Sequence, residues 1–176
     1  MPRRPRLPLF LLLVLVSCGS RGGADGYVGG TVPLDCAPFA RALSGLHLSG
    51  AAADWWWQAD GRYARDEVPS IGSVLVLRRS DRLASGHVAV VSQVSGARQI
   101  LVTQANWVHH RVSQDQPVTD VSPANDWSMV RVWWPPTDAM GITVYPAYGF
   151  IHADRPATRE QIAAATPGAI RLAVGE

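Results

Sequence analysis

Short apolar runs alternate along the chain with segments rich in Gly, Ser and Pro. The β-branched runs at residues 88–91 and 100–102 flank a polar segment around Gly96, and this pattern predicts an antiparallel hairpin. We expect further strands at 74–77, 130–133 and 150–151. Beyond an N-terminal leader, about 150 residues remain, enough for one domain with a core of its own.

Helical patterns precede these strands. A short helix is predicted to carry Cys36 at its start, because Asp35 is a good N-cap, Pro38 is tolerated in a first turn and Gly45 follows the apolar stretch. A second helix is predicted at 51–59 and is apolar nearly all round.

A last helix is predicted near the C-terminus. Thr158 and Gln161 have the spacing of a capping box, and we expect Pro167 with the following Gly to stop this accessory helix, which has no chemical role. The expected fold class is therefore α+β, with N-terminal helices packed on a mostly antiparallel β-sheet.

The N-terminal residues have the composition of a secretory signal. Three arginines precede the apolar run 9–16, which is far shorter than the roughly 17 to 25 residues of a spanning helix. The leader ends in Leu-Val-Ser before Cys18, and this sequence resembles a bacterial lipobox. We expect Cys18 to be lipidated and to become the new N-terminus; the alternative is ordinary cleavage nearby, with Cys18 incidental.

The predicted boundaries follow from this leader. They are a signal peptide at 1–18, a flexible Gly-rich tether at 19–32, a folded domain at 33–152 and a C-terminal helix or tail at 153–176.

The positive charge of the chain belongs largely to the leader. Without its three arginines, 13 of the 16 basic residues remain against 14 acidic ones, a net charge of −1 with the histidines neutral. Nucleic-acid-binding proteins instead concentrate Lys and Arg in a basic patch. We therefore expect no nucleic-acid partner.

Candidate chemistry centres on Cys36, His87 and Asn106. A helix N-terminus favours the thiolate, which is the nucleophilic form of cysteine. If the hairpin turn is centred between Gly96 and Ala97, His87 faces Asn106, whose side-chain oxygen could hold the imidazole. The alternatives are a buried Cys, a core His and a turn Asn.

The second cysteine bears on this prediction. If Cys18 carries a lipid, Cys36 is left as the only thiol in an oxidising compartment, which favours a catalytic role. A disulfide between Cys18 and Cys36 is the competing interpretation.

Several segments resemble, in order, the CHAP family of cysteine- and histidine-dependent amidohydrolases and peptidases, which is papain-like and related to the NlpC/P60 enzymes. They are Cys-Ala-Pro-Phe-Ala-Arg from Cys36, the Trp-rich stretch 54–63, the Pro-x-x-Gly entry at 69–76, Gly-His-Val-Ala-Val-Val around His87 and Ala-Asn-Trp around Asn106. The resemblance covers about 33–135 and continues more weakly to 151. It implies a papain-like or NlpC/P60-like fold and a CHAP-like catalytic domain at 33–152.

The resemblance also suggests roles for site residues. Cys36 would be the nucleophile, His87 the base and Asn106 its partner, whereas many members have Glu at the position of Gln104. Gln104 is therefore an auxiliary candidate. Asp126 is a candidate substitute carboxylate, with a turn residue that caps its own backbone as the alternative.

Tryptophans are candidates for a substrate groove. Trp107 lies beside Asn106 in the sequence, and Trp55 and Trp56 belong to the stretch 51–59. The alternative for at least two of the tryptophans in that stretch is packing against the sheet. No cofactor and no metal are expected, because His109 and His110 lack the spacing of metal ligands.

The expected function is that of an exported cysteine amidohydrolase or endopeptidase that cleaves an amide bond in peptidoglycan through an acyl-enzyme. The expected location is the cell envelope, on its periplasmic or extracellular face, with attachment to the membrane through the lipid on Cys18. The alternatives are a non-catalytic module that binds wall peptides or a protein partner, and a papain-like amidase on an amide outside peptidoglycan.

Overall fold

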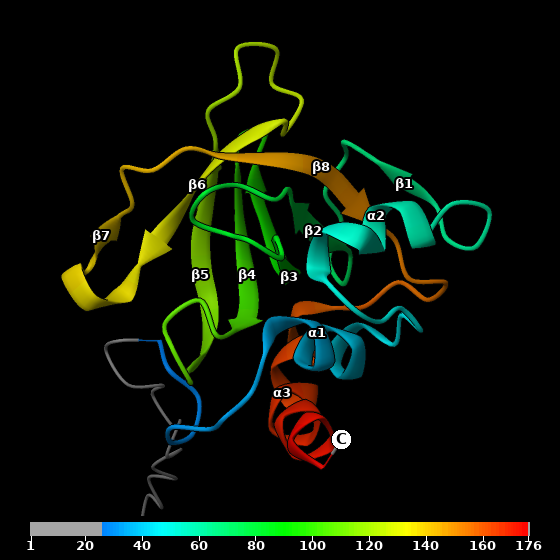
Figure 1. Ribbon diagram of the computed structural model, residues 1–176, viewed down its shortest axis with the longest axis vertical. Coiled ribbons are helices and arrows are strands. Elements are labelled where there is room, and N and C mark those ends of the chain that lie inside the picture. Colours follow the sequence, from blue (N-terminus) through cyan, green and yellow to red (C-terminus); the bar gives the residue numbers. More distant parts are fainter. Residues whose placement is uncertain (1–25, 176) are drawn as a thin grey trace, which may run out of the picture.

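A sheet that closes on itself organises the molecule. The computed structural model describes residues 26–175 (Figure 1). Its elements are α1 (Cys36–Ser44), the 3-10 helix η1 (Ala52–Asp54), α2 (Trp55–Gln58), β1 (Arg65–Asp66), β2 (Val74–Leu77), β3 (His87–Gly96), β4 (Gln99–Ala105), β5 (Val112–Asp120), β6 (Met129–Trp134), the 3-10 helix η2 (Pro135–Thr137), β7 (Ala139–Met140), β8 (Tyr145–Ile151) and α3 (Arg159–Val174).

The sheet has the strand order β1-β8-β2-β3-β4-β5-β6-β7, and β8 also pairs with β6. Strands β2, β3, β4, β5, β6 and β8 therefore form a closed six-stranded antiparallel barrel (Figure 1). Closure leaves these strands without free edges.

The predicted fold class, α+β with N-terminal helices packed on a mostly antiparallel sheet, is wrong. A closed β-barrel dominates the described residues, and their three α-helices are short. The decisive contacts are those of β8, which joins β2 and β6 from a distant part of the chain. Hydrophobic periodicity reports which face of a strand is buried, and it contains no information on such long-range pairing.

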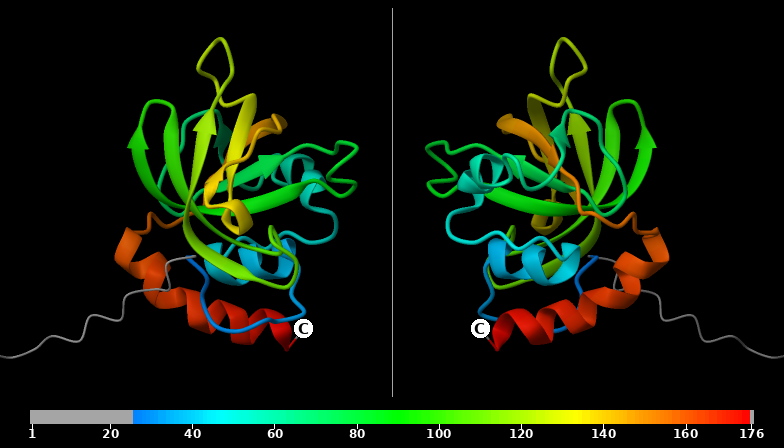
Figure 2. Two further views of the ribbon diagram at one scale, coloured as in Figure 1. Left: turned by 90° about the vertical axis from the view of Figure 1, so that its left-hand side faces the viewer. Right: turned by 90° about the vertical axis from the view of Figure 1, so that its right-hand side faces the viewer.

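The barrel wall is apolar on both faces. Leu75 and Leu77 belong to the core inside the barrel, whereas Val74 and Val76 belong to a second core that includes α1 and α3. Both helices lie against one side of the barrel (Figure 2). Strand β2 therefore reads as an uninterrupted apolar run, and full burial of each such side chain contributes about 1.5–3 kcal/mol.

The predicted helices are found with changed extents. Helix α1 ends at Ser44 and is followed, as predicted, by Gly45, which adopts a left-handed conformation, whereas the stretch 51–59 divides into η1 and α2. Helix α3 starts with the predicted capping box at Thr158 but continues through Pro167. Its residues Ile162, Thr166, Ala169 and Ala173 are buried. This packing outweighs the cost of about 3 kcal/mol that proline adds inside a helix.

The β3–β4 hairpin differs from the prediction at its turn. Gly96 pairs with Gln99, and two register shifts follow along the ladder. By Val90, which pairs with Thr103, the register is the one that the sequence predicts for the end of the hairpin carrying His87. The two irregularities compensate for the displaced turn.

The residues before α1 run beside β5. The backbone N–H of Val28 donates to Val112, that of Val32 donates to His110, and Tyr27 forms a bridge with Ser113. This part of the predicted tether therefore packs on the barrel. The predicted signal peptide and Cys18 lie outside the described residues. Within 26–175, no helix has the length and apolar character needed to cross a membrane.

Candidate active site

Cys36 and His87 lie together where helix α1 and strand β3 begin. Cys36 is the first residue of α1, and His87 is the first residue of β3. Both line a cavity of about 650 Å³. The other residues that line it are Asp35, Ala37, Pro38, Arg41, Gly50, Ala51, Ala52, Leu83, Ser85, Gly86 and Asn106.

Gly86 lets the chain pack closely against its neighbours just before His87. Its φ is +72°, and an added Cβ would lie 2.6 Å from both the Cβ of Ala53 and the carbonyl oxygen of Leu77. Only glycine fits this left-handed, tightly packed position. The Gly before the histidine thus lets β3 begin directly against β2 and η1, which holds the imidazole at the cavity.

The Cys36 thiol lies in an environment that favours its charged form. Burial would by itself raise the pKa of Cys36, but the charge of His87, a hydrogen bond with its ring and one with the Val88 backbone outweigh burial and lower that pKa. The charge of Asp35 partly opposes this shift. The backbone contact at Val88 could not be seen in the sequence, because no side-chain pattern marks it.

His87 shows the complementary shift. Burial would lower its pKa, but the charge of Cys36 and hydrogen bonds with Cys36 and Gln104 raise it above the ordinary value. His87 is 4% exposed. A thiolate and an imidazolium therefore stabilise each other in a place where either charge alone would be costly.

Gln104 holds the imidazole. Its Oε1 lies 3.0 Å from Nε2 of His87, and the side chain is buried. Because the amide oxygen can only accept, Nε2 carries the proton in this arrangement, which leaves Nδ1 for the thiol. The Gln104 amide nitrogen has no hydrogen-bond partner within the described part of the chain.

The predicted contact between Asn106 and His87 is not present. Strand β4 ends at Ala105, and Asn106 adopts a left-handed backbone with φ of +58°. Its side chain donates to Asp35 Oδ1 and accepts from the His110 backbone N–H. The register was predicted correctly near this end, but the strand stops one residue too early for Asn106 to share the face of His87.

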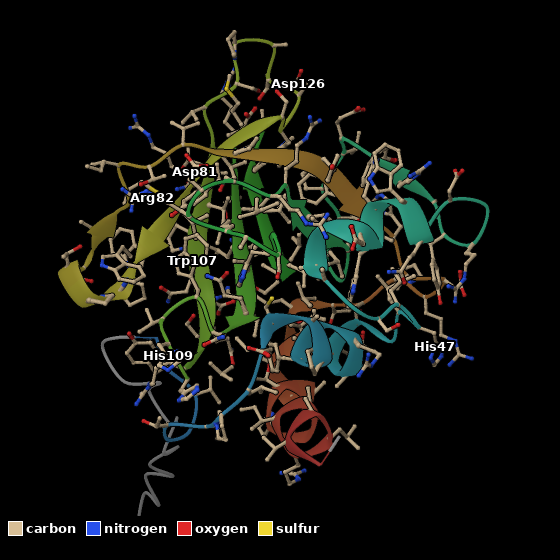
Figure 3. The ribbon with its side chains drawn as sticks, viewed as in Figure 1. His47, Asp81, Arg82, Trp107, His109 and Asp126 are labelled. Carbon is tan, nitrogen blue, oxygen red and sulfur yellow. The ribbon has the colours of Figure 1, made fainter. Side chains whose placement is uncertain are left out.

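Asp126 lies far from this cavity, at the end of the barrel away from α1 (Figure 3). Its carboxylate accepts from the backbone and hydroxyl of Ser128. Those hydrogen bonds, with one from Ser122, lower the pKa of Asp126. The residue is therefore a turn residue here, and the suggestion that it replaces a catalytic carboxylate does not hold.

The three tryptophans suggested for a groove lie in different places. Trp55 is 0% exposed in the core, so it cannot line a groove. Trp56 stacks on Tyr148 with ring centroids 5.6 Å apart, and the guanidinium of Arg65 covers it. Trp107 alone adjoins the site, with its ring centroid 5.0 Å from that of His87.

The arrangement of Cys36, His87 and Gln104 suits nucleophilic chemistry. No group of three His, Cys, Asp or Glu residues in the range 26–175 is arranged to hold a metal ion. A partly buried thiol of lowered pKa, a base beside it and a neutral amide behind the base are the parts that acyl transfer needs.

Comparison with known proteins identifies a related family. No curated protein matches the chain. The family model described as CHAP domain matches residues 26–106, a range that includes Cys36, His87 and Gln104. This family comprises hydrolases of the amidase and peptidase type, with peptidoglycan as the implied substrate. Residues 26–106 are therefore identified with the CHAP domain family, as the sequence motifs indicate.

Proposed function

We propose that this protein is an exported cysteine amidase or endopeptidase that cleaves an amide bond of peptidoglycan. The observation that carries the proposal is that Cys36 and His87 line one cavity with Gln104 hydrogen-bonded to His87, an arrangement that lowers the pKa of Cys36 and raises that of His87. Perturbed pairs of this kind are characteristic of catalytic sites. The CHAP match supports the substrate class.

In the proposed mechanism, Nδ1 of His87 takes the proton of the Cys36 thiol. The sulfur then attacks the amide carbonyl carbon, and the backbone N–H of Cys36 at the start of α1 helps to hold the oxyanion. The C–N bond breaks as His87 returns the proton to the leaving amine. Water, deprotonated by His87, releases the thioester and regenerates the thiol.

Gln104 is the positioning residue in this proposal. Its hydrogen bond fixes the orientation and the tautomer of His87, and it favours the imidazolium without adding a charge. Asn106 instead connects the loop after β4 to Asp35, beside the nucleophile.

We further propose that Cys18 is lipidated and holds the enzyme at the cell envelope. The support is the sequence of the leader alone. The intact mass of the mature protein tests this, because a Cys18 that is unmodified, or cleavage elsewhere, would contradict the anchor.

The first prediction concerns the reaction. Full-length protein incubated with purified peptidoglycan should release soluble fragments, whereas Cys36→Ala protein should release none, because no other group of the site can form the thioester. Mass spectrometry of the fragments identifies the bond that is cleaved. Equal release by both proteins would contradict a cysteine mechanism, and release by neither would contradict hydrolysis of this substrate.

The second prediction concerns the thiol. Alkylation of native Cys36 by iodoacetamide, followed by mass spectrometry of its peptide, should continue well below about pH 8.5, the ordinary thiol pKa. His87→Ala should lower the rate at pH 7 at least about tenfold, since burial then raises the pKa against the Val88 hydrogen bond alone. His47→Ala, a change at an exposed histidine, is the matched control. Alkylation only after unfolding would contradict the proposed nucleophile.

The third prediction separates Gln104 from Asn106. Gln104→Ala should reduce kcat/KM about 10- to 100-fold, since a hydrogen bond to a charged group is worth about 1.5–3 kcal/mol. Asn106→Gly, which keeps the left-handed backbone, should cost less. Gln104→Glu should move the alkaline limb of the pH–activity profile upward, because a carboxylate raises the pKa of His87. A larger loss in Asn106→Gly would reverse the assignment.

A further inference from the structure

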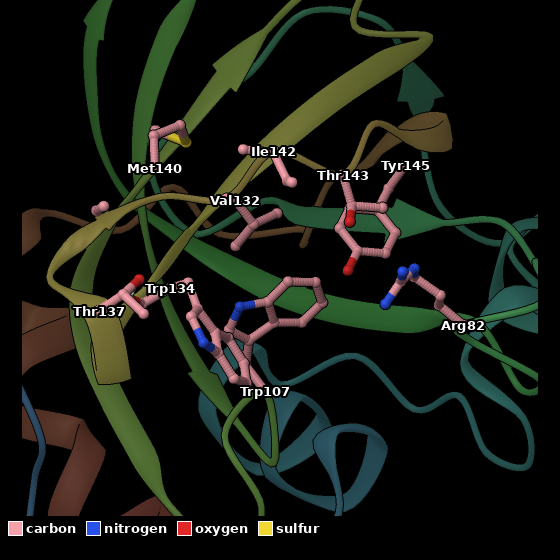
Figure 4. A pocket seen from close by; sticks show the side chains of 11 residues that line it. Arg82, Trp107, Val132, Trp134, Thr137, Met140, Ile142, Thr143 and Tyr145 are labelled. Atoms are coloured by element: carbon pink, nitrogen blue, oxygen red, sulfur yellow. Dashed lines mark hydrogen bonds between the residues drawn. The ribbon is translucent and has the colours of Figure 1, made fainter.

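A second cavity lies beside the catalytic one. It has a volume of about 530 Å³ and is built largely from β6, β7 and the segment that leads into β8 (Figure 4). Trp107 and Arg82 complete its lining. Apart from Arg82, all of these residues follow residue 106, where the match to the CHAP family ends.

At two points of the chain, consecutive residues line different cavities. Leu83 and Asn106 line the catalytic cavity, whereas Arg82 and Trp107 line the second one. The Trp107 ring contacts the His87 ring and also the Tyr145 ring, whose centroid is 5.2 Å away. Trp107 therefore connects the surroundings of His87 to the lining of the second cavity.

The lining of the second cavity has two chemically different parts. Trp107, Val132, Trp134 and Met140 give it an apolar wall, to which the aromatic rings contribute broad faces (Figure 4). Arg82, Thr143 and Tyr145 give it a polar edge, and the Arg82 side chain extends toward the Tyr145 hydroxyl (Figure 4). Apolar walls with a few convergent polar groups are typical of small-ligand sites.

Backbone hydrogen bonds fix the main chain around Arg82, whereas its guanidinium has no partner of opposite charge among the described residues. It lies in the turn that Ser80 and Leu83 close with two backbone hydrogen bonds. Between residues 26 and 175, its guanidinium has no hydrogen bond, ion pair or ring contact, unlike Arg79 nearby, which pairs with Asp54. A planar guanidinium without an acidic partner, at the edge of an apolar cavity, is suited to bidentate binding of a carboxylate.

We propose that this cavity is a specificity subsite for the part of the substrate that flanks the cleaved amide. Arg82 binds a free carboxylate of the wall peptide, and the neighbouring apolar or sugar part of the substrate packs on Trp107 and Trp134. The inference rests on the proposed function, because it places the reacting amide at Cys36.

Two synthetic wall peptides test the subsite. They are identical except that a glutamate carboxylate is free in one and amidated in the other. Calorimetric titration of full-length Cys36→Ala protein measures binding without turnover. We expect the free carboxylate to bind about tenfold tighter or more than the amide, since a hydrogen bond to a charged group is worth about a factor of ten or more.

Arg82→Gln in the same background should abolish that preference and leave the weaker affinity for the amidated peptide unchanged. Arg131→Gln is the matched control, because Arg131 is exposed on β6 and lines neither cavity. In the active enzyme, Arg82→Gln should raise KM for the free-carboxylate peptide with little change in kcat. Circular dichroism checks that each variant is folded.

The outcomes separate this inference from the proposed function. Binding that depends on Arg82, without cleavage by the wild type, would support the subsite and contradict the hydrolase. Cleavage that is equal for both peptides, or unaffected by Arg82→Gln, would overturn the subsite and leave the hydrolase standing. Failure of Cys36→Ala protein to bind either peptide would also overturn the subsite.

Discussion

The mutual compensation of two buried charges is the constraint on which this site depends. A lone thiolate or a lone imidazolium would be destabilised by desolvation at the position of Cys36 or His87. Together, each charge is the main favourable influence on the other. The compensation requires the start of α1 and the start of β3 to keep their positions relative to each other. The site is therefore only as rigid as the contact between these two elements.

The double-sided barrel wall provides that rigidity. Strand β3 contributes Val88 and Val90 to the core shared with α1, and Ala89 and Val91 to the core inside the barrel. A shift of β3 would disturb both cores, and close-packed interiors resist such shifts. His87 therefore stands on one of the most constrained strands of the molecule, while the thiol approaches it from the helical layer.

Local signals in the sequence, together with the family resemblance, pointed to Cys36 and His87, which line one cavity, and to some of the element boundaries. The apolar β-branched runs marked the strands, Gly45 marked the end of α1, and Thr158 with Gln161 marked the start of α3. Closure of the barrel could not be predicted in this way, because it depends on β8 pairing with strands that are distant in sequence. The apolar runs are equally compatible with an open sheet.

The choice between Gln104 and Asn106 shows a finer limit. Counting residues across the hairpin gave the right register near His87, but it could not show that the chain leaves the extended conformation at Asn106. Because the backbone is left-handed at Asn106, the hydrogen bond with His87 is made by Gln104 instead. Likewise, a run of three tryptophans does not say which ring is turned inward, and Trp55 proves to be the buried one.

The position of β8 in the chain has a consequence for biosynthesis. Cys36, His87 and Gln104 are all translated before the strand that joins β2 to β6. Until that strand has left the ribosome, β2 and β6 both present unpaired backbone edges, which favour association with other chains. The nascent protein thus holds Cys36, His87 and Gln104 before it has the closed wall that aligns them, so completion of the candidate site and protection from aggregation coincide, late in synthesis.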